Sequence, residues 1–513
     1  MLRLQVLEGR YGQVRAEGDP KLAAAAQDYL RPLRGGEVIE SAPLERAALL
    51  LSDLPGVTAT PSIRPGPDLG AGDLPVQVQR GDRVNGSVGL DNQDNRYTGQ
   101  YRANASLAVN SPFLAGDQIT VRAQGTSEDL YFGDVGYSLS LGSAGLRGQV
   151  GYGDTGYQPG KDFSDLDARG TAQVASAGLR YPLVRSQSRN LTLGVDFQHK
   201  KLRDDYRAAD VRQNKSSNRV PFRAQFDLRD GLGGGVTYGA LNWTVGHLNL
   251  GGALAEADSL TARSAGHFST VNLDIARLQS LAPRWSLYGR FGGQWTRDNL
   301  DSSEDFGPGG PAGVRADPVG EGYGDRGWLT QIELRYAAGP VTPFLFYDAG
   351  RVQYAARPWQ PGENFRRIAG ASLGARVAVG SWRAEATAAW RTDGGKPESD
   401  SRDRKPLVWV TAQYVFQSCS GGGRRGPAPR RLRRDAAARQ SRNRAAAATA
   451  VGASAPSSRP PMPTAPFWNA PRSSATPAGF GALAITVSPP PATAPATSMY
   501  FDASEMPSMS EPR

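Results

Sequence analysis

The side chains that most often perform catalysis or bind metals are scarce in this chain. Its 513 residues include three histidines, His199, His247 and His267, and one cysteine, Cys419. No zinc-ligand spacing and no Walker phosphate loop occurs. His199 falls on the apolar face of an alternating stretch, near its end, where an interfacial position is favoured over a catalytic one. The sequence therefore predicts a protein that is not an enzyme, with no catalytic residues, no metal and no cofactor.

One glycine pattern is similar to a nucleotide-binding loop. Residues 151–156 read Gly-Tyr-Gly-Asp-Thr-Gly, which matches Gly-x-Gly-x-x-Gly. Such a loop binds phosphate where it follows a strand and opens a helix, because the helix N-terminus supplies the amide donors. Here no helical pattern follows. We therefore predict a turn without a ligand.

The elements that would position any functional residues fall into three regions. Residues 1–80 have the periodicities of a small α/β domain, a short mixed sheet with two helices on one face. The expected elements are strands at 2–8 and 13–16, helices at 21–33 and 42–54, and strands at 57–64 and 73–79.

Residues 81–416 contain no convincing helix but many alternating stretches separated by turn residues. The clearest are residues 190–202, 220–229, 285–296, 328–336, 382–391 and 407–416. One face of each stretch is apolar and the other is strongly polar, as where Arg383, Glu385 and Arg391 alternate with alanine and tryptophan. A sandwich core would not tolerate such a charged face, whereas the wet interior of a membrane barrel would.

Aromatic residues stand at both ends of several apolar faces. The pairs are Trp285 and Trp295, Trp328 and Tyr336, and Trp382 and Trp390. Lipid outside, water inside and an aromatic belt at each interface produce this pattern, whereas a β-sandwich explains only the alternation. At about 21 residues per strand and turn, the region predicts an antiparallel barrel of about 16 strands. Residues 297–326, rich in Gly and Pro, form the longest loop candidate.

Composition and charge agree with a barrel. No run of 18 apolar residues occurs, which excludes transmembrane helices. The net charge of +10 lies mostly in residues 417–513, which contain 12 arginines, no lysine and 4 acidic residues. The remainder carries about +2, too little for a nucleic-acid footprint.

The two ends of the chain carry separate expectations. No signal peptide precedes the first strand, so we expect the chain to start downstream of its true N-terminus. Residues 417–513 lack periodicity and are rich in Ala, Pro, Ser and Arg, which predicts a disordered low-complexity tail. Since outer-membrane barrels commonly end in an aromatic such as Phe416, we hypothesise that this tail is a frameshift product.

Several motifs in sequence order resemble the two-partner secretion transporters, the haemolysin secretion/activation proteins also called TpsB. Residues 7–10 and 44–57 look like the second POTRA domain of that family, and residues 90–99 look like its first barrel hairpin. Residues 309–318 and 320–325 look like its signature loop, which folds back into the barrel. Residues 346–350, Phe-Tyr-Asp-Ala-Gly, match its Phe-x-Asp-x-Gly strand motif. The resemblance covers residues 1–416.

The resemblance implies a site inside the barrel. Arg315, which follows Val314, would be the tip of the inserted loop, and Asp348 would be its partner on the wall, between Phe346 and Gly350. A guanidinium gains a fixed position by bidentate pairing with a carboxylate. The alternative is a solvated Arg315 and an ordinary polar wall at Asp348. Asp317 departs from the family, which has an aromatic residue there, and this departure weakens the case for apolar packing of the tip.

The resemblance also implies a function: an outer-membrane pore of a Gram-negative-type bacterium that secretes a partner exoprotein without ATP. The POTRA-like domain at 1–80, the second of two, would lie in the periplasm and accept an extended client segment at a sheet edge. The expected partners are the exoprotein and outer-membrane lipid, not a nucleic acid or a small-molecule substrate. The rival interpretations are an outer-membrane protein insertase with POTRA repeats, a passive porin and an outer-membrane hydrolase.

Overall fold

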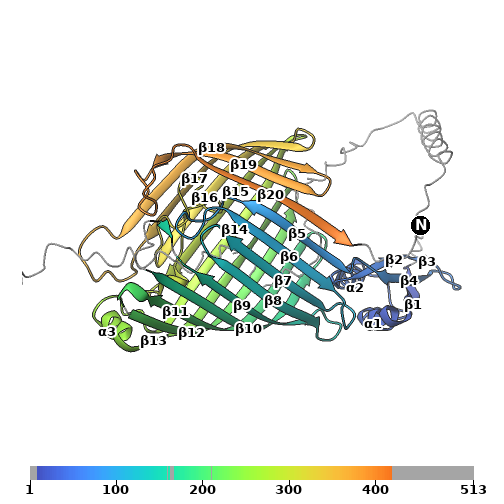
Figure 1. The fold of residues 1–513 in the computed structure, drawn as a ribbon. Coiled ribbons are helices and arrows are strands. Elements are labelled where there is room, and N and C mark those ends of the chain that lie inside the picture. The colour runs from blue at the N-terminus through green and yellow to red at the C-terminus, as the bar shows by residue number, and fades with distance from the viewer. Residues whose placement is uncertain (1–7, 159, 162–166, 210, 231, 419–513) are drawn as a thin grey trace, which may run out of the picture.

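The computed structural model describes residues 8–158, 160–161, 167–209, 211–230 and 232–418. It consists of a small α+β domain followed by a closed β-barrel, and the small domain lies at one end of the barrel (Figure 1). Nearly all of the predicted strand at 2–8, and the predicted tail beyond residue 418, lie outside the described residues. No helix in the described ranges is long and apolar enough to cross a membrane.

The N-terminal domain contains both predicted helices, but three strands follow them, because the strand predicted at 57–64 is divided into two. Its elements are β1 (Arg10–Gly18), α1 (Pro20–Leu30), α2 (Ser41–Ser52), β2 (Val57–Pro61), β3 (Arg64–Pro65) and β4 (Ala71–Arg80). The sheet order is β1-β4-β2, with β1 parallel to β4 and β2 antiparallel to it. Asp19 begins α1 by accepting hydrogen bonds from the backbone N–H groups of Lys21 (3.1 Å) and Leu22 (3.3 Å).

One compact core holds this domain together. Leu30 and Leu51 from the helices pack against Leu74, Val76 and Val78 of the central strand, and all five side chains are buried. A small domain depends on such a core, because its conformational entropy cost is only narrowly offset.

Truncating the core should therefore unfold the domain locally. We expect Leu51→Ala to destabilise it by about 2–5 kcal/mol, since the change leaves a cavity at a fully buried position. Hydrogen exchange of residues 8–80 in the purified full chain measures this. Leu69→Ala, at a side chain that is 93% exposed, is the control and should leave exchange unchanged.

The barrel has 16 antiparallel strands, which confirms the predicted number. They are β5 (Val84–Asp91), β6 (Arg102–Asn110), β7 (Gln118–Thr126), β8 (Tyr131–Ser140), β9 (Arg147–Tyr157), β10 (Ala168–Arg185), β11 (Arg189–Tyr206), β12 (Val211–Asp230), β13 (Gly235–Leu250), β14 (Gly266–Ala282), β15 (Trp285–Thr296), β16 (Arg326–Tyr336), β17 (Val341–Gln353), β18 (Phe365–Val379), β19 (Trp382–Asp393) and β20 (Leu407–Ser418). The barrel closes where β20 pairs with β5, from Thr411 opposite Asp91 to Ser418 opposite Val84.

The apolar faces predicted from the alternation point outward. Trp285, Trp328, Ile332 and Trp382 are all exposed, although a soluble protein would bury side chains of this size. The aromatic ends meet across strands, with ring centroids 4.8 Å apart for Trp285 and Tyr336. The charged faces line the interior, as in a membrane barrel.

Three expectations for the barrel region were wrong in detail. A helix, α3 (Gly252–Leu260), occurs in the loop after β13, because Asp258 accepts hydrogen bonds from Ser264 and Ala265 and closes that loop. Residues 151–156 are not a turn but the middle of β9, paired on both sides. Strands β10 to β14 are 16–20 residues long, longer than the stretches predicted at 190–202 and 220–229. Strand β12 reaches 20 residues because its polar first half, residues 211–219, continues past the apolar belt.

The N-terminal domain contacts the barrel through α2 and the residues after it. Asp53 binds Arg185, at the end of β10, with both carboxylate oxygens at 2.6 Å. Arg46 donates to the carbonyl of Pro182 at 2.9 Å, and Glu45 accepts from the backbone N–H of Gln187 at 2.6 Å. These charge-assisted contacts fix the domain on the turns at one end of the barrel.

Candidate functional site

The loop between β15 and β16 enters the barrel, as predicted for residues 297–326. We call residues 297–325 the inserted loop. Its tip is buried, with Val314 0% and Arg315 4% exposed. The tip contacts a strand far from it in the sequence: the indole nitrogen of Trp409 in β20 donates to the carbonyl of Arg315 at 2.8 Å. The loop therefore occupies the interior of the barrel.

Arg315 and Asp348 form the pair that the resemblance implies. The guanidinium binds side-on: Nε and Nη2 each lie 2.7 Å from one oxygen of Asp348. The backbone N–H of Arg315 donates to the same carboxylate at 3.2 Å. Asp348 is 0% exposed, so its charge depends on this partner.

The other three predicted residues complete the contact. The guanidinium carbon of Arg315 lies 3.3 Å from the centre of the Phe346 ring, a cation–π contact. Gly350 leaves room for the loop, because a Cβ there would lie 2.9 Å from the Cβ of Pro308 and 3.4 Å from a methyl of Val314. All five residues singled out in the sequence thus meet at one place.

A second carboxylate that the sequence analysis missed belongs to this site. Glu333 of β16 accepts from Nη1 of Arg315 at 2.6 Å. It also accepts from Arg335 (2.7 Å) and Arg376 (3.0 Å) on the wall. We call Arg315, Asp348, Glu333 and Phe346 the Arg315 cluster. The alternation of β16 places Glu333 on the inner face, which was the available signal.

The two limbs of the inserted loop have their own ion pairs with the wall. In the part of the loop before the tip, Glu304 binds Lys200 of β11 and Arg219 of β12, both at 2.6 Å. In the part of the loop after the tip, Glu321 is 0% exposed and binds Arg366 of β18. Charged anchors thus hold the loop along its length.

The departure at Asp317 does not remove the apolar packing of the tip. Ala316 packs against Phe344, Phe346 and Ala389 in a buried cluster. The Asp317 side chain is 1% exposed, and its nearest ion-pair partner is Nε of Arg391 at 3.7 Å. Alanine therefore supplies contacts that the aromatic residue was expected to provide.

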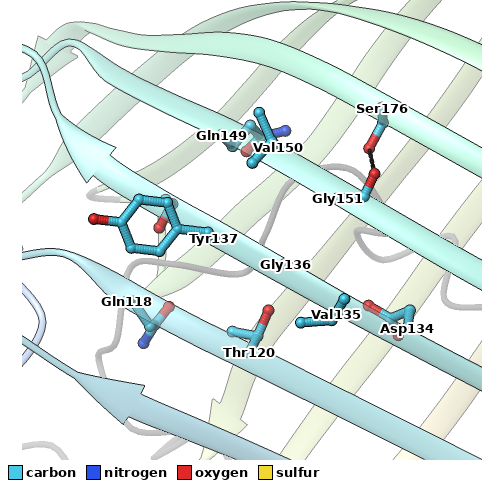
Figure 2. A pocket seen from close by; sticks show the side chains of 11 residues that line it. Gln118, Thr120, Asp134, Val135, Gly136, Tyr137, Gln149, Val150, Gly151 and Ser176 are labelled. Carbon is cyan, nitrogen blue, oxygen red and sulfur yellow. Dashed lines mark hydrogen bonds between the residues drawn. The ribbon is translucent and has the colours of Figure 1, made fainter. Parts of the chain in front are cut away.

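Other possible sites in the described ranges are wall structure. Figure 2 shows a hollow across β7 to β10, lined by residues such as Thr120 and Ser176. The acidic residue in its lining, Asp134, is bound by Arg122 at 2.6 and 3.1 Å.

Residues 370–374 have the spacing Gly-x-Ser-x-Gly of serine hydrolases. That spacing works at a strand-to-helix turn, whereas Ser372 lies inside β18, which is paired on both sides.

Comparison with known proteins decides the family. The model of the family described as haemolysin secretion/activation protein ShlB/FhaC/HecB matches residues 70–377. The chain belongs to this family. Both the family and the barrel fold indicate the outer membrane of a Gram-negative-type bacterium.

Members of the haemolysin secretion/activation family and solved barrels are similar to this chain. The heme/hemopexin transporter protein HuxB of Haemophilus influenzae is 26% identical over 371 residues, which are 69% of this chain and 64% of HuxB. The outer membrane transporter CdiB of Escherichia coli is 26% identical over 349 residues, 66% of this chain and 58% of CdiB. The chain thus spans less than two thirds of these relatives. The structure of CdiB from E. coli matches with a TM-score of 0.65 at 20% identity, covering 80% of this chain and 77% of that one, which supports the fold.

Proposed function

We propose that this protein is an outer-membrane pore that secretes a partner exoprotein without ATP. Membership of the haemolysin secretion/activation family supports this function, as does a closed barrel wide enough to contain a folded-in loop. The exoprotein and outer-membrane lipid are its partners in this proposal, and no cofactor, nucleic acid or small-molecule substrate is required.

The observation that carries the proposal is the Arg315 cluster. A loop bound to the wall by a buried guanidinium, two carboxylates and an aromatic ring occupies the path through the barrel. A protein-conducting pore needs an element that closes the path and can move away. We propose that the loop shifts when a client enters.

We assign the N-terminal domain as a POTRA domain in the periplasm, where it receives the client. Strand addition requires a free sheet edge. At β1, Gln27 of α1 already bonds to the backbone of Val14 (3.1 Å) and Ala16 (2.8 Å). The edge at β2 is therefore the one we assign to an extended client segment, and the contact of α2 with Arg185 places that edge near the barrel.

The test is to delete the gene in its host and compare the secreted proteins. We expect one exoprotein to disappear from the medium and to return when the wild-type gene is supplied. A periplasmic marker enzyme in the medium controls for leakage. An unchanged set of secreted proteins, together with fewer assembled outer-membrane barrels, would instead support the insertase, and loss of small-solute uptake alone would support a porin.

A further inference from the structure

Two arginines lie side by side on the outer face of the barrel. Arg351 of β17 and Arg367 of β18 are direct cross-strand partners, and both are exposed. Their guanidinium carbons lie 4.5 Å and 5.3 Å from the centre of the Phe365 ring. Like charges directly opposite each other on a sheet destabilise the strand pairing. An anion bound between the two guanidinium groups would remove this repulsion.

No protein group supplies that anion in the described part of the chain. Neither arginine forms an ion pair there, and the acidic residues nearest in sequence or register, Glu363 and Asp393, do not reach them. Two other outward arginines, Arg203 of β11 and Arg212 of β12, differ because both bind Asp205.

The arginine pair marks the boundary of the apolar surface. Trp328 is the cross-strand partner of Arg351 and is 39% exposed. Toward the N-terminal domain, the same outer face carries the exposed apolar side chains Leu345 and Leu373. Aromatic belts lie at the level where lipid tails meet headgroups, so the two guanidinium groups lie at headgroup level.

We propose that Arg351 and Arg367 bind the phosphate of a membrane-lipid headgroup. Guanidinium groups match phosphate oxygens through paired N–H donors, and the ion offsets the repulsion between the two charges. The apolar belt directly beside the pair receives the acyl chains, which favours a phosphorylated lipid over a free phosphate. This inference rests on the proposed membrane placement but not on secretion.

The test uses the full chain, purified in detergent, with bis-phosphorylated lipid A as the probe and native mass spectrometry as the readout. We expect the wild type to retain the lipid. Arg351→Gln with Arg367→Gln should weaken binding about tenfold or more. Arg351→Lys with Arg367→Lys keeps the charge but loses the planar fork, so an intermediate loss is expected. Heat-modifiable migration on gels verifies that each barrel is folded.

The matched control removes two outward arginines that already have a partner. Arg203→Gln with Arg212→Gln should bind the lipid as the wild type does. Equal loss in this control would show general charge attraction and overturn the site. Unchanged binding in both Arg351/Arg367 variants would do the same, and displacement of the lipid by inorganic phosphate would identify a free-anion site instead. Secretion is measured separately, so a failed secretion assay would not be mistaken for failed lipid binding.

Discussion

Arg315→Ala should free the tip of the inserted loop from the wall and sharply reduce secretion while the barrel remains in the membrane. The change leaves Asp348 and one oxygen of Glu333 buried without their partner, at a cost of about 3–5 kcal/mol. The equilibrium constant between the wall-bound and the released position of the loop tip would then shift roughly 100-fold or more toward release. Secreted client and single-channel conductance in planar bilayers are the measurements, and conductance should rise.

The control for this experiment is an arginine of a different loop, the one between β17 and β18. Arg357 is exposed and makes one ion pair, with Asp298 at 3.3 Å. Exposed pairs contribute little, so Arg357→Ala should change neither secretion nor conductance. If Arg315→Ala behaved like this control, the Arg315 cluster would have no part in closing the pore.

Gly370→Val, a substitution in the wall strand β18, should displace the tip of the inserted loop without changing any charged residue. A Cβ at Gly370 would lie 2.2 Å from the Cβ of Ala316, so the tip and β18 cannot both keep their positions. We expect Gly370→Val to raise the conductance as Arg315→Ala does, although it leaves the Arg315 cluster intact. Gly289→Val is the control, because a Cβ there meets nothing within 4 Å. Wild-type conductance in Gly370→Val would mean that the tip accommodates the added methyl groups and that packing does not position it.

The barrel could be predicted because its physics repeats along the chain. Strands such as β15, with bounds at Trp285 and Thr296, follow from alternation and terminal aromatics alone. The pair of Arg315 and Asp348 came from the family resemblance, since 33 residues of sequence separate them and no local pattern joins them.

The features that were missed depend on contacts that periodicity does not encode. Glu333 is one of many inward charges, and only the loop selects it. Helix α3 exists because Asp258 closes its loop, and a short apolar stretch does not reveal that contact. Gly370 reads as an ordinary strand glycine until Ala316 is placed against it.

The charges around the loop tip have a consequence for the open pore. Three arginines and three carboxylates balance there: Arg315, Arg335 and Arg376 against Asp348, Glu333 and Glu385. Only Arg315 belongs to the inserted loop, which we propose to move. When it leaves, the wall at this height keeps one uncompensated negative charge, so an open channel should favour cations over anions and hold basic side chains of a passing polypeptide longer than acidic ones.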